Sequence, residues 1–174
     1  MLYYKCKINY AVLPILYQEE LIIKEDSMQI TSRFTIAVHI ITCIDYFKDE
    51  YKVTSNFIAK STGVNPVIIR GVLSQLKEAG MINIRRGASG ITLAKRLDDI
   101  TFYDIYKAVD SVKDEGLFHF HEKPNTDCPV GRNIHAATDN RLHQIQASME
   151  KEMKQIKLSS VADDVRSRIK AEES

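Results

Sequence analysis

The sequence has few cysteines and almost no net charge, and both shortages limit what the protein can be. Three cysteines occur in 174 residues, Cys6, Cys43 and Cys128. An odd number of widely spaced cysteines argues against a disulfide framework and indicates a reducing compartment. The formal net charge is +1, so the charge of the whole chain gives no indication of a nucleic-acid partner.

Long apolar stretches are also missing. No segment approaches the roughly 18 apolar residues of a membrane helix. The apolar segment YAVLPIL (residues 10–16) is short, is interrupted by Pro14 and is followed by Glu19 and Glu20. It lacks the small-residue cleavage site of a signal peptide. We therefore expect a cytoplasmic protein with no membrane partner.

The motifs of common enzymes do not occur. The chain has no Walker loop, no dinucleotide-binding glycine motif, no HExxH and no nucleophile elbow. The segment RRGASG (residues 85–90) is too short to cradle a phosphate and lacks the strand–helix context. We expect that the protein is not an enzyme and has no catalytic residues.

Charge is distributed unevenly along the chain. Residues 28–96 contain ten Lys and Arg against four Asp and Glu, a net of +6. Residues 97–174 contain eleven against fifteen, a net of −4. Ordinary surface scatter is one explanation. The other, which we favour, is that an anion-binding surface lies in the first half.

Residues 1–27 follow no sustained hydrophobic period. The tripeptide KED (residues 24–26) can be encoded by AAG-GAG-GAY, which reads as a bacterial ribosome-binding site just before Met28. We therefore expect residues 1–27 to be an untranslated leader included in the sequence. The alternative is a genuine N-terminal arm outside the core.

Three helical segments are predicted within residues 28–80. The first carries an apolar stripe made of Ile36, Ala37, Ile40, Ile41, Ile44 and Phe47. The second is short and ends at Gly63, a natural residue for closing a helix. Asn65 and Pro66 then offer the N-cap and first position of a third helix that ends at Gly80. The tight turn between the last two predicts a helix-turn-helix.

The third helix divides into an apolar and a lightly charged face. The face expected to be buried carries Ile69, Val72, Leu73 and Leu76. The opposite face carries Val67, Arg70, Gly71 and Ser74. Small residues permit close approach, so this face favours a helix lying in a groove over a solvated helix.

An alternating pattern after Gly80 predicts a β-hairpin. Ile82 and Ile84 should point to one side and return through Ile91 and Leu93 after the turn. Three helices and a hairpin in this order predict a mainly α fold, a winged helix-turn-helix whose hairpin is the wing. We expect the wing to contact phosphates or the minor groove of DNA. A winged helix that only mediates protein contacts is the alternative.

The rest of the chain predicts a fourth helix, a loop and a long helix. Thr101 and Asp104 form a capping box for a helix packed through Ile105, Tyr106 and Val109. We divide the chain into a DNA-binding domain (28–112), a sensor-type loop (113–131) and a dimerisation helix with a C-terminal helix (132–174). The long helix, from about Arg132, carries a stripe expected to pack on a second subunit, formed by Leu142, Ile145, Met149, Met153 and Ile156. Ser159 or Ser160 is expected to cap the last helix.

Three segments, ITSRFTIAVHI, VNPVIIRGVLSQLKEAGMINIRRGASGITLAK and DITFYDIYKAVD, resemble the Rrf2 family of bacterial regulators. The resemblance runs from Met28 to about Lys170. It implies a homodimeric winged-helix transcription factor, usually a repressor, with crossed long helices at the dimer interface and a palindromic double-stranded operator. The expected DNA-binding residues are Arg33, Asn65, Pro66, Val67, Arg70, Ser74, Arg85, Arg86 and Ser89.

The loop before the long helix separates branches of this family. Iron–sulfur members carry three clustered cysteines there, whereas this loop has only Cys128, in HEKPNTDCPVG. The resemblance is therefore to the cluster-free branch with the YwnA-like regulators, and no iron–sulfur cluster is expected. Cys128 precedes Pro129 where the long helix should start, which favours a thiolate and makes it a candidate sensor of a redox or small-molecule signal. A structural role for Cys128 is the alternative.

A metal-responsive regulator is a further alternative. His119, His121, Cys128 and His135 lie within one short span and are weak candidate ligands. Their spacing matches no strong metal-binding signature, and histidines in a polar loop are more often solvated. We expect no metal site.

Overall fold

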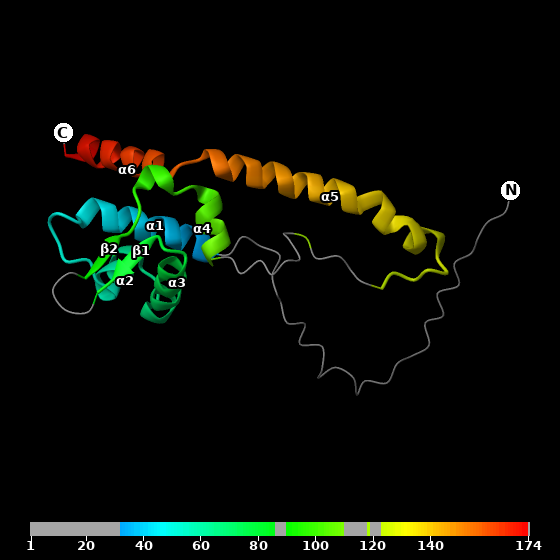
Figure 1. The fold of residues 1–174 in the computed structure, drawn as a ribbon, viewed down its shortest axis with the longest axis horizontal. Coiled ribbons are helices and arrows are strands. Elements are labelled where there is room, and N and C mark those ends of the chain that lie inside the picture. The colour runs from blue at the N-terminus through cyan, green and yellow to red at the C-terminus, as the bar shows by residue number, and fades with distance from the viewer. Residues whose placement is uncertain (1–31, 86–89, 110–117, 119–122, 174) are drawn as a thin grey trace, which may run out of the picture.

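The computed structural model describes residues 32–85, 90–109, 118 and 123–173. The element order is α1 (Ser32–Phe47), α2 (Ser55–Thr62), α3 (Pro66–Glu78), β1 (Ile82–Ile84), β2 (Ile91–Leu93), the 3-10 turn η2 (Leu97–Asp99), α4 (Phe102–Val109), α5 (Pro129–Gln155) and α6 (Leu158–Glu172). In Figure 1, α1–α4 and the hairpin gather into one body, α6 lies beside α1, and α5 extends away from the body. The expected mainly α fold with a small hairpin is confirmed.

The core of this body is formed by the apolar faces of the helices. The fully buried side chains of α1 are Ala37, Ile40, Ile41 and Ile44, and those of α3 include Ile69, Val72 and Leu76. Ile105, Tyr106 and Val109 of α4 close the same core, as the sequence predicted. In α4, the Thr101 amide donates to Asp104 Oδ2 at 2.8 Å, and the Asp104 amide donates to Thr101 Oγ1 at 3.2 Å. This capping box fixes where α4 begins.

The turn between α2 and α3 is set by local hydrogen bonds. Thr54 caps α2 by accepting a hydrogen bond from the Phe57 amide at 3.2 Å. Gly63 ends α2 in the left-handed region, with φ of 66°. Asn65 Oδ1 then accepts from the Val67 amide at 2.8 Å and starts α3. The predicted helix-turn-helix is confirmed. Helix α3 is its second helix.

The hairpin pairs β1 and β2 antiparallel, with Ile82 opposite Leu93 and Ile84 opposite Ile91. The Ile91 amide donates to the Val53 carbonyl at 3.0 Å, which attaches the wing to the segment before α2. Of the two residues expected on one side of this strand, Ile82 is buried, whereas Ile84 is 39% exposed. Ile84 borders a cleft, although its cross-strand partner Ile91 is only 6% exposed.

Helix α6 packs on the body and contributes to its core. Leu158 and Ala162 are buried in its core, and the Leu158 amide donates to the Ile100 carbonyl at 2.9 Å. Arg166 of α6 pairs with the buried carboxylate of Asp45 in α1. These contacts start α6 at Leu158, so the expected caps Ser159 and Ser160 lie inside the helix.

Helix α5 differs from every other helix described, because none of its residues is buried. Pro129 is its first residue and Cys128 its N-cap, so it begins three residues before the predicted Arg132. Only its C-terminal part reaches the body, where Met149 and Met153 pack against the core. Across the residues described, no helix is both long and apolar enough to span a membrane.

Candidate nucleic-acid interface

The outward face of α3 is built as the sequence predicted. Val67, Arg70, Gly71 and Ser74 are all exposed, while Ile69, Val72, Leu73 and Leu76 are buried. At about 100° per residue, Gly71 and Ser74 lie within about 40° of Val67 and form the midline of this face. A Cβ added at Gly71 would have no atom within 4 Å, so this midline is open to a close-approaching surface.

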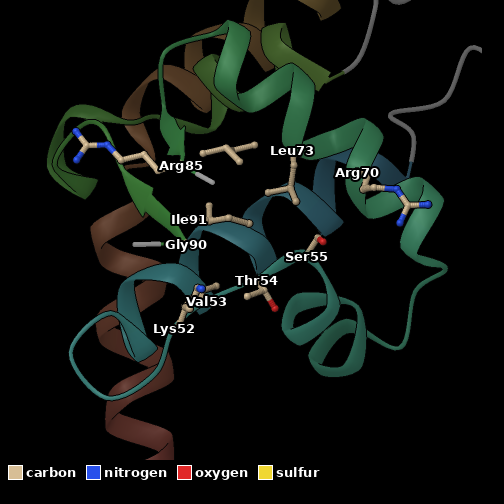
Figure 2. Close-up of a pocket in the computed structure, with 10 residues that line it drawn as sticks. Lys52, Val53, Thr54, Ser55, Arg70, Leu73, Arg85, Gly90 and Ile91 are labelled. Carbon is tan, nitrogen blue, oxygen red and sulfur yellow. The ribbon is translucent and has the colours of Figure 1, made fainter. Parts of the chain in front are cut away.

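A cleft of about 390 Å³ separates α3 from the wing. It is lined by Lys52, Val53, Thr54, Ser55, Arg70, Leu73, Ile84, Arg85, Gly90 and Ile91. Figure 2 shows Arg70 and Arg85 at opposite ends of this cleft and Lys52 below the wing. Three of the lining residues are cationic and none is acidic. The cleft therefore offers an anion a positive rim over an apolar floor.

The cations of this surface have no acidic partner among the residues that the structure describes. Within the part of the chain that the structure describes, no ion pair involves Arg33, Lys52, Arg70 or Arg85. By contrast, Arg166 pairs with Asp45 and Asp163, and Arg168 pairs with Asp164. Unneutralised cations around a protruding helix are the electrostatic pattern of a phosphate-binding surface.

The other expected DNA-binding residues are placed unevenly. Asn65 and Pro66 are exposed, but Asn65 Oδ1 is already occupied as the helix cap. Ser74 Oγ donates to Glu78 Oε1 at 3.0 Å, so its hydroxyl is also engaged. Arg33 lies exposed in the first turn of α1. Arg86 and Ser89 fall outside the described residues.

Two residues of this surface were missed by sequence reasoning. Lys52 joins the cleft only because the wing is bonded to residue 53, a contact between distant segments that no local pattern reveals. Ile68 is 42% exposed beside Val67, which is 64% exposed. Ile68 lies about 100° from Val67 and about 90° from the centre of the buried Ile69–Leu76 face, so helical periodicity places it at the border of that face and does not settle its exposure.

Cys128 lies where the sequence predicted, directly before Pro129 at the start of α5. Hydrogen bonds from the backbone amides of Gly131 and Val130 lower the pKa of its thiol. The preceding turn is fixed by the Cys128 amide, which donates to the Asn125 carbonyl at 3.2 Å. Burial has the opposite effect on Cys43, whose pKa is raised. The two thiols therefore differ in reactivity by location alone.

Of the four weak metal candidates, Cys128 and His135 lie in the described residues. His119 and His121 lie outside the described residues. His135 Nδ1 lies 3.2 Å from Asp139 Oδ1 on the same face of α5. Among residues 32–85, 90–109, 118 and 123–173, no three His, Cys, Asp or Glu side chains gather as a metal site would require.

Comparison with known proteins gives consistent matches. The profile of the family described as "Rrf2: Iron-dependent Transcriptional regulator" matches residues 30–164. The candidate HTH-type transcriptional regulator YwnA of Bacillus subtilis (strain 168) is 40% identical over 132 residues, covering 76% of this chain and 96% of YwnA. A crystal structure of a candidate DNA-binding protein matches with a TM-score of 0.58 and 32% identity, covering 74% of this chain and 97% of that one. IscR of T. potens matches with a TM-score of 0.58 and 20% identity, covering 79% and 88%, which shows the shared fold alone.

The iron in that family description calls for a test against the residues present. Iron–sulfur clusters are held chiefly by cysteine thiolates, typically four. The chain has three cysteines, and Cys43 is 4% exposed within the core of the body. With Cys43 fixed there, only Cys6 and Cys128 remain as thiol ligands. This donor set does not fit a cysteine-ligated cluster.

Proposed function

Because this chain belongs to the Rrf2 family of transcriptional regulators, we propose that it is a cytoplasmic homodimeric repressor that binds a palindromic DNA operator. The observation that carries this proposal is the set of cations Lys52, Arg70 and Arg85 around the outward face of α3, none of which is ion-paired with a residue in the described part of the chain. Duplex DNA supplies closely spaced phosphates for such cations and a groove that accepts a helix.

The experiment is a titration of duplex DNA taken from the intergenic region beside the gene, at several salt concentrations. The logarithm of the binding constant should fall linearly with the logarithm of salt. Arg86→Ala should weaken binding to all sequences and reduce that slope by about one, since it removes one phosphate contact. Arg168→Ala, whose arginine pairs with Asp164 on α6, is the matched control. Equal slopes for Arg86→Ala and wild type would contradict the role of the wing.

The dimer proposal rests on α5. Its side chains Val130 and Ile145 are 69% and 54% exposed, and Leu142 is partly buried. Met149 and Met153 already pack on the body of the same chain, so the open part of the stripe lies N-terminal to them. The α5 helix of a second copy offers the same surface and would cover it around a two-fold axis. Two α3 helices would then meet major grooves about one turn, or a small multiple, apart.

The signal proposal rests on Cys128. Cys128 is the N-cap residue of α5, and the backbone amides of Gly131 and Val130 lower the pKa of its thiol. Modification of this thiol by an oxidant or electrophile would disturb the start of α5 and shift the spacing of the two bodies. We therefore take a redox or small-molecule signal to act through Cys128.

A further inference from the structure

The first turn of α3 exposes two large apolar side chains side by side. Val67 is 64% exposed and Ile68 is 42% exposed. Val67 lies on the midline of the outward face, while Ile68 and Arg70 flank it on opposite sides. Single exposed apolar residues are common, but an adjacent pair in the first turn of the second helix of a helix-turn-helix indicates a contact surface.

Polar groups near Val67 have little capacity to read a base edge. Asn65 Oδ1 is held by the Val67 amide at 2.8 Å, and Ser74 Oγ donates to Glu78 at 3.0 Å. Gly71 contributes no side chain to the midline. The midline of α3 therefore presents methyl groups and open backbone where other recognition helices present amides or guanidinium groups.

The distribution of charge along α3 favours approach of its N-terminal end to DNA. The exposed carboxylate of Glu78 lies at its C-terminal end, where it would oppose phosphates. The N-terminal end carries no acidic residue in its first turn and has the positive end of the helix dipole. Arg70 and the cationic cleft flank this end. The turn that contains Val67 and Ile68 therefore enters the groove first.

The major groove displays one apolar group, the C5-methyl of thymine. We propose that Val67, flanked by Ile68, determines operator specificity by packing against a thymine methyl in each half-site. This inference rests on the proposed DNA-binding function and deepens it, because it names the base that the first turn of α3 reads. Arg70 at the side of the helix remains available for a phosphate or a guanine.

The test compares thymine with uracil, which pairs identically and keeps the O4 acceptor but lacks the methyl. An operator is first selected from random duplexes with the full-length protein. Each thymine is then replaced singly by deoxyuridine, and the dissociation constants of wild type and Val67→Ala are measured. Replacement at one or two positions per half-site should weaken wild-type binding about fourfold per methyl. Val67→Ala should bind the thymine and uracil operators equally at those positions.

Two controls separate the possible outcomes. Lys77→Ala, on the exposed side of α3 near its end, should keep the full thymine preference. If wild type selects an operator but tolerates uracil everywhere, the thymine proposal is overturned while DNA binding stands. If Val67→Ala loses affinity and keeps the thymine preference, Val67 contacts DNA in another way and the proposal is likewise wrong. Absence of any duplex binding would overturn the proposed function itself.

Discussion

The body and α5 are two helical regions of one chain that are stabilised in different ways. In the body, each helix buries an apolar face, and Ile40, Ile69 and Ile105 are all 0% exposed. Helix α5 is the longest at 27 residues, yet none of its residues is buried. Burial of one such isoleucine contributes about 1.5–3 kcal/mol, and α5 gains none of this along most of its length. The body is stabilised by contacts within the chain, whereas we expect most of α5 to be stabilised by contacts with a second copy of the chain.

The comparison also separates two parts of the function. The body contains the proposed DNA-binding surface, formed by α3, the wing and the cations beside them, and α6 is fixed to the body through Asp45 and Arg166. Helix α5 extends from the same body, away from α3 and the hairpin (Figure 1). If the α5 helices of two copies pack together, they would hold the two DNA-binding bodies at a fixed distance and orientation.

The largest expected effect comes from breaking the body. Ile40→Ala should lower the free energy of unfolding by about 2–5 kcal/mol, because it leaves a cavity in a closed core. The loss should be the same at all protein concentrations in urea denaturation. Ile145→Ala on α5 should instead give a loss that grows as the protein is concentrated, since its partner is another chain. Similar concentration dependence for both variants would remove the distinction.

A smaller effect is expected where the wing joins the body. Gly90 has φ of 66°, and an added Cβ would lie 2.6 Å from the Val53 carbonyl oxygen. Gly90→Ala should therefore cost about 1–3 kcal/mol and weaken DNA binding by displacing the wing. Thermal unfolding and DNA titration would measure the two effects.

Gly71→Ala is the matched variant for Gly90, because its Cβ would meet nothing within 4 Å in the interior of α3. It should raise stability by about 0.5–1 kcal/mol through helix propensity. It should still weaken operator binding, because the new methyl lies on the midline that approaches DNA. A Gly71→Ala protein that binds its operator as tightly as wild type would show that this face is not buried against DNA.

The smallest effect concerns reactivity and leaves stability unchanged. The lowered pKa of Cys128 keeps more thiolate present at neutral pH, and the raised pKa of Cys43 keeps less. As pH falls, alkylation of Cys128 should therefore persist to lower pH than alkylation of Cys43, as followed by mass spectrometry. The urea-unfolded chain is the control, in which both rates should converge. A folded-state rate for Cys128 no faster than that of a free thiol would end its role as a sensor.

What could be predicted from the sequence was local. The faces of α3, the stop at Gly63 and the Thr101–Asp104 capping box each depend on residues within one or two turns, and all three are confirmed. Contacts between distant segments could not be predicted. Leu158 starts α6 by bonding to Ile100, and Ile84 borders the cleft beside α3 and is 39% exposed.

The residues of the candidate site also differ in whether local sequence patterns could predict them. Arg70 and Val67 were predictable from helical periodicity, since their exposure follows from the buried positions on the same helix. Lys52 was not, because its place in the cleft depends on a hydrogen bond between residues 53 and 91. Nothing in the residues near Lys52 specifies that bond.

The most direct test of the account measures whether α5 couples two reading bodies. Wild type, Ile145→Glu and the matched control Gln144→Glu, which adds the same charge one residue earlier, are titrated with the full operator and with a single half-site. Wild type and Gln144→Glu should prefer the full operator by about 10²-fold or more, because linked bodies bind with a high effective concentration. Ile145→Glu should bind the full operator no better than twice as well as the half-site, while its half-site affinity stays at the wild-type value. Full preference retained by Ile145→Glu would contradict the account.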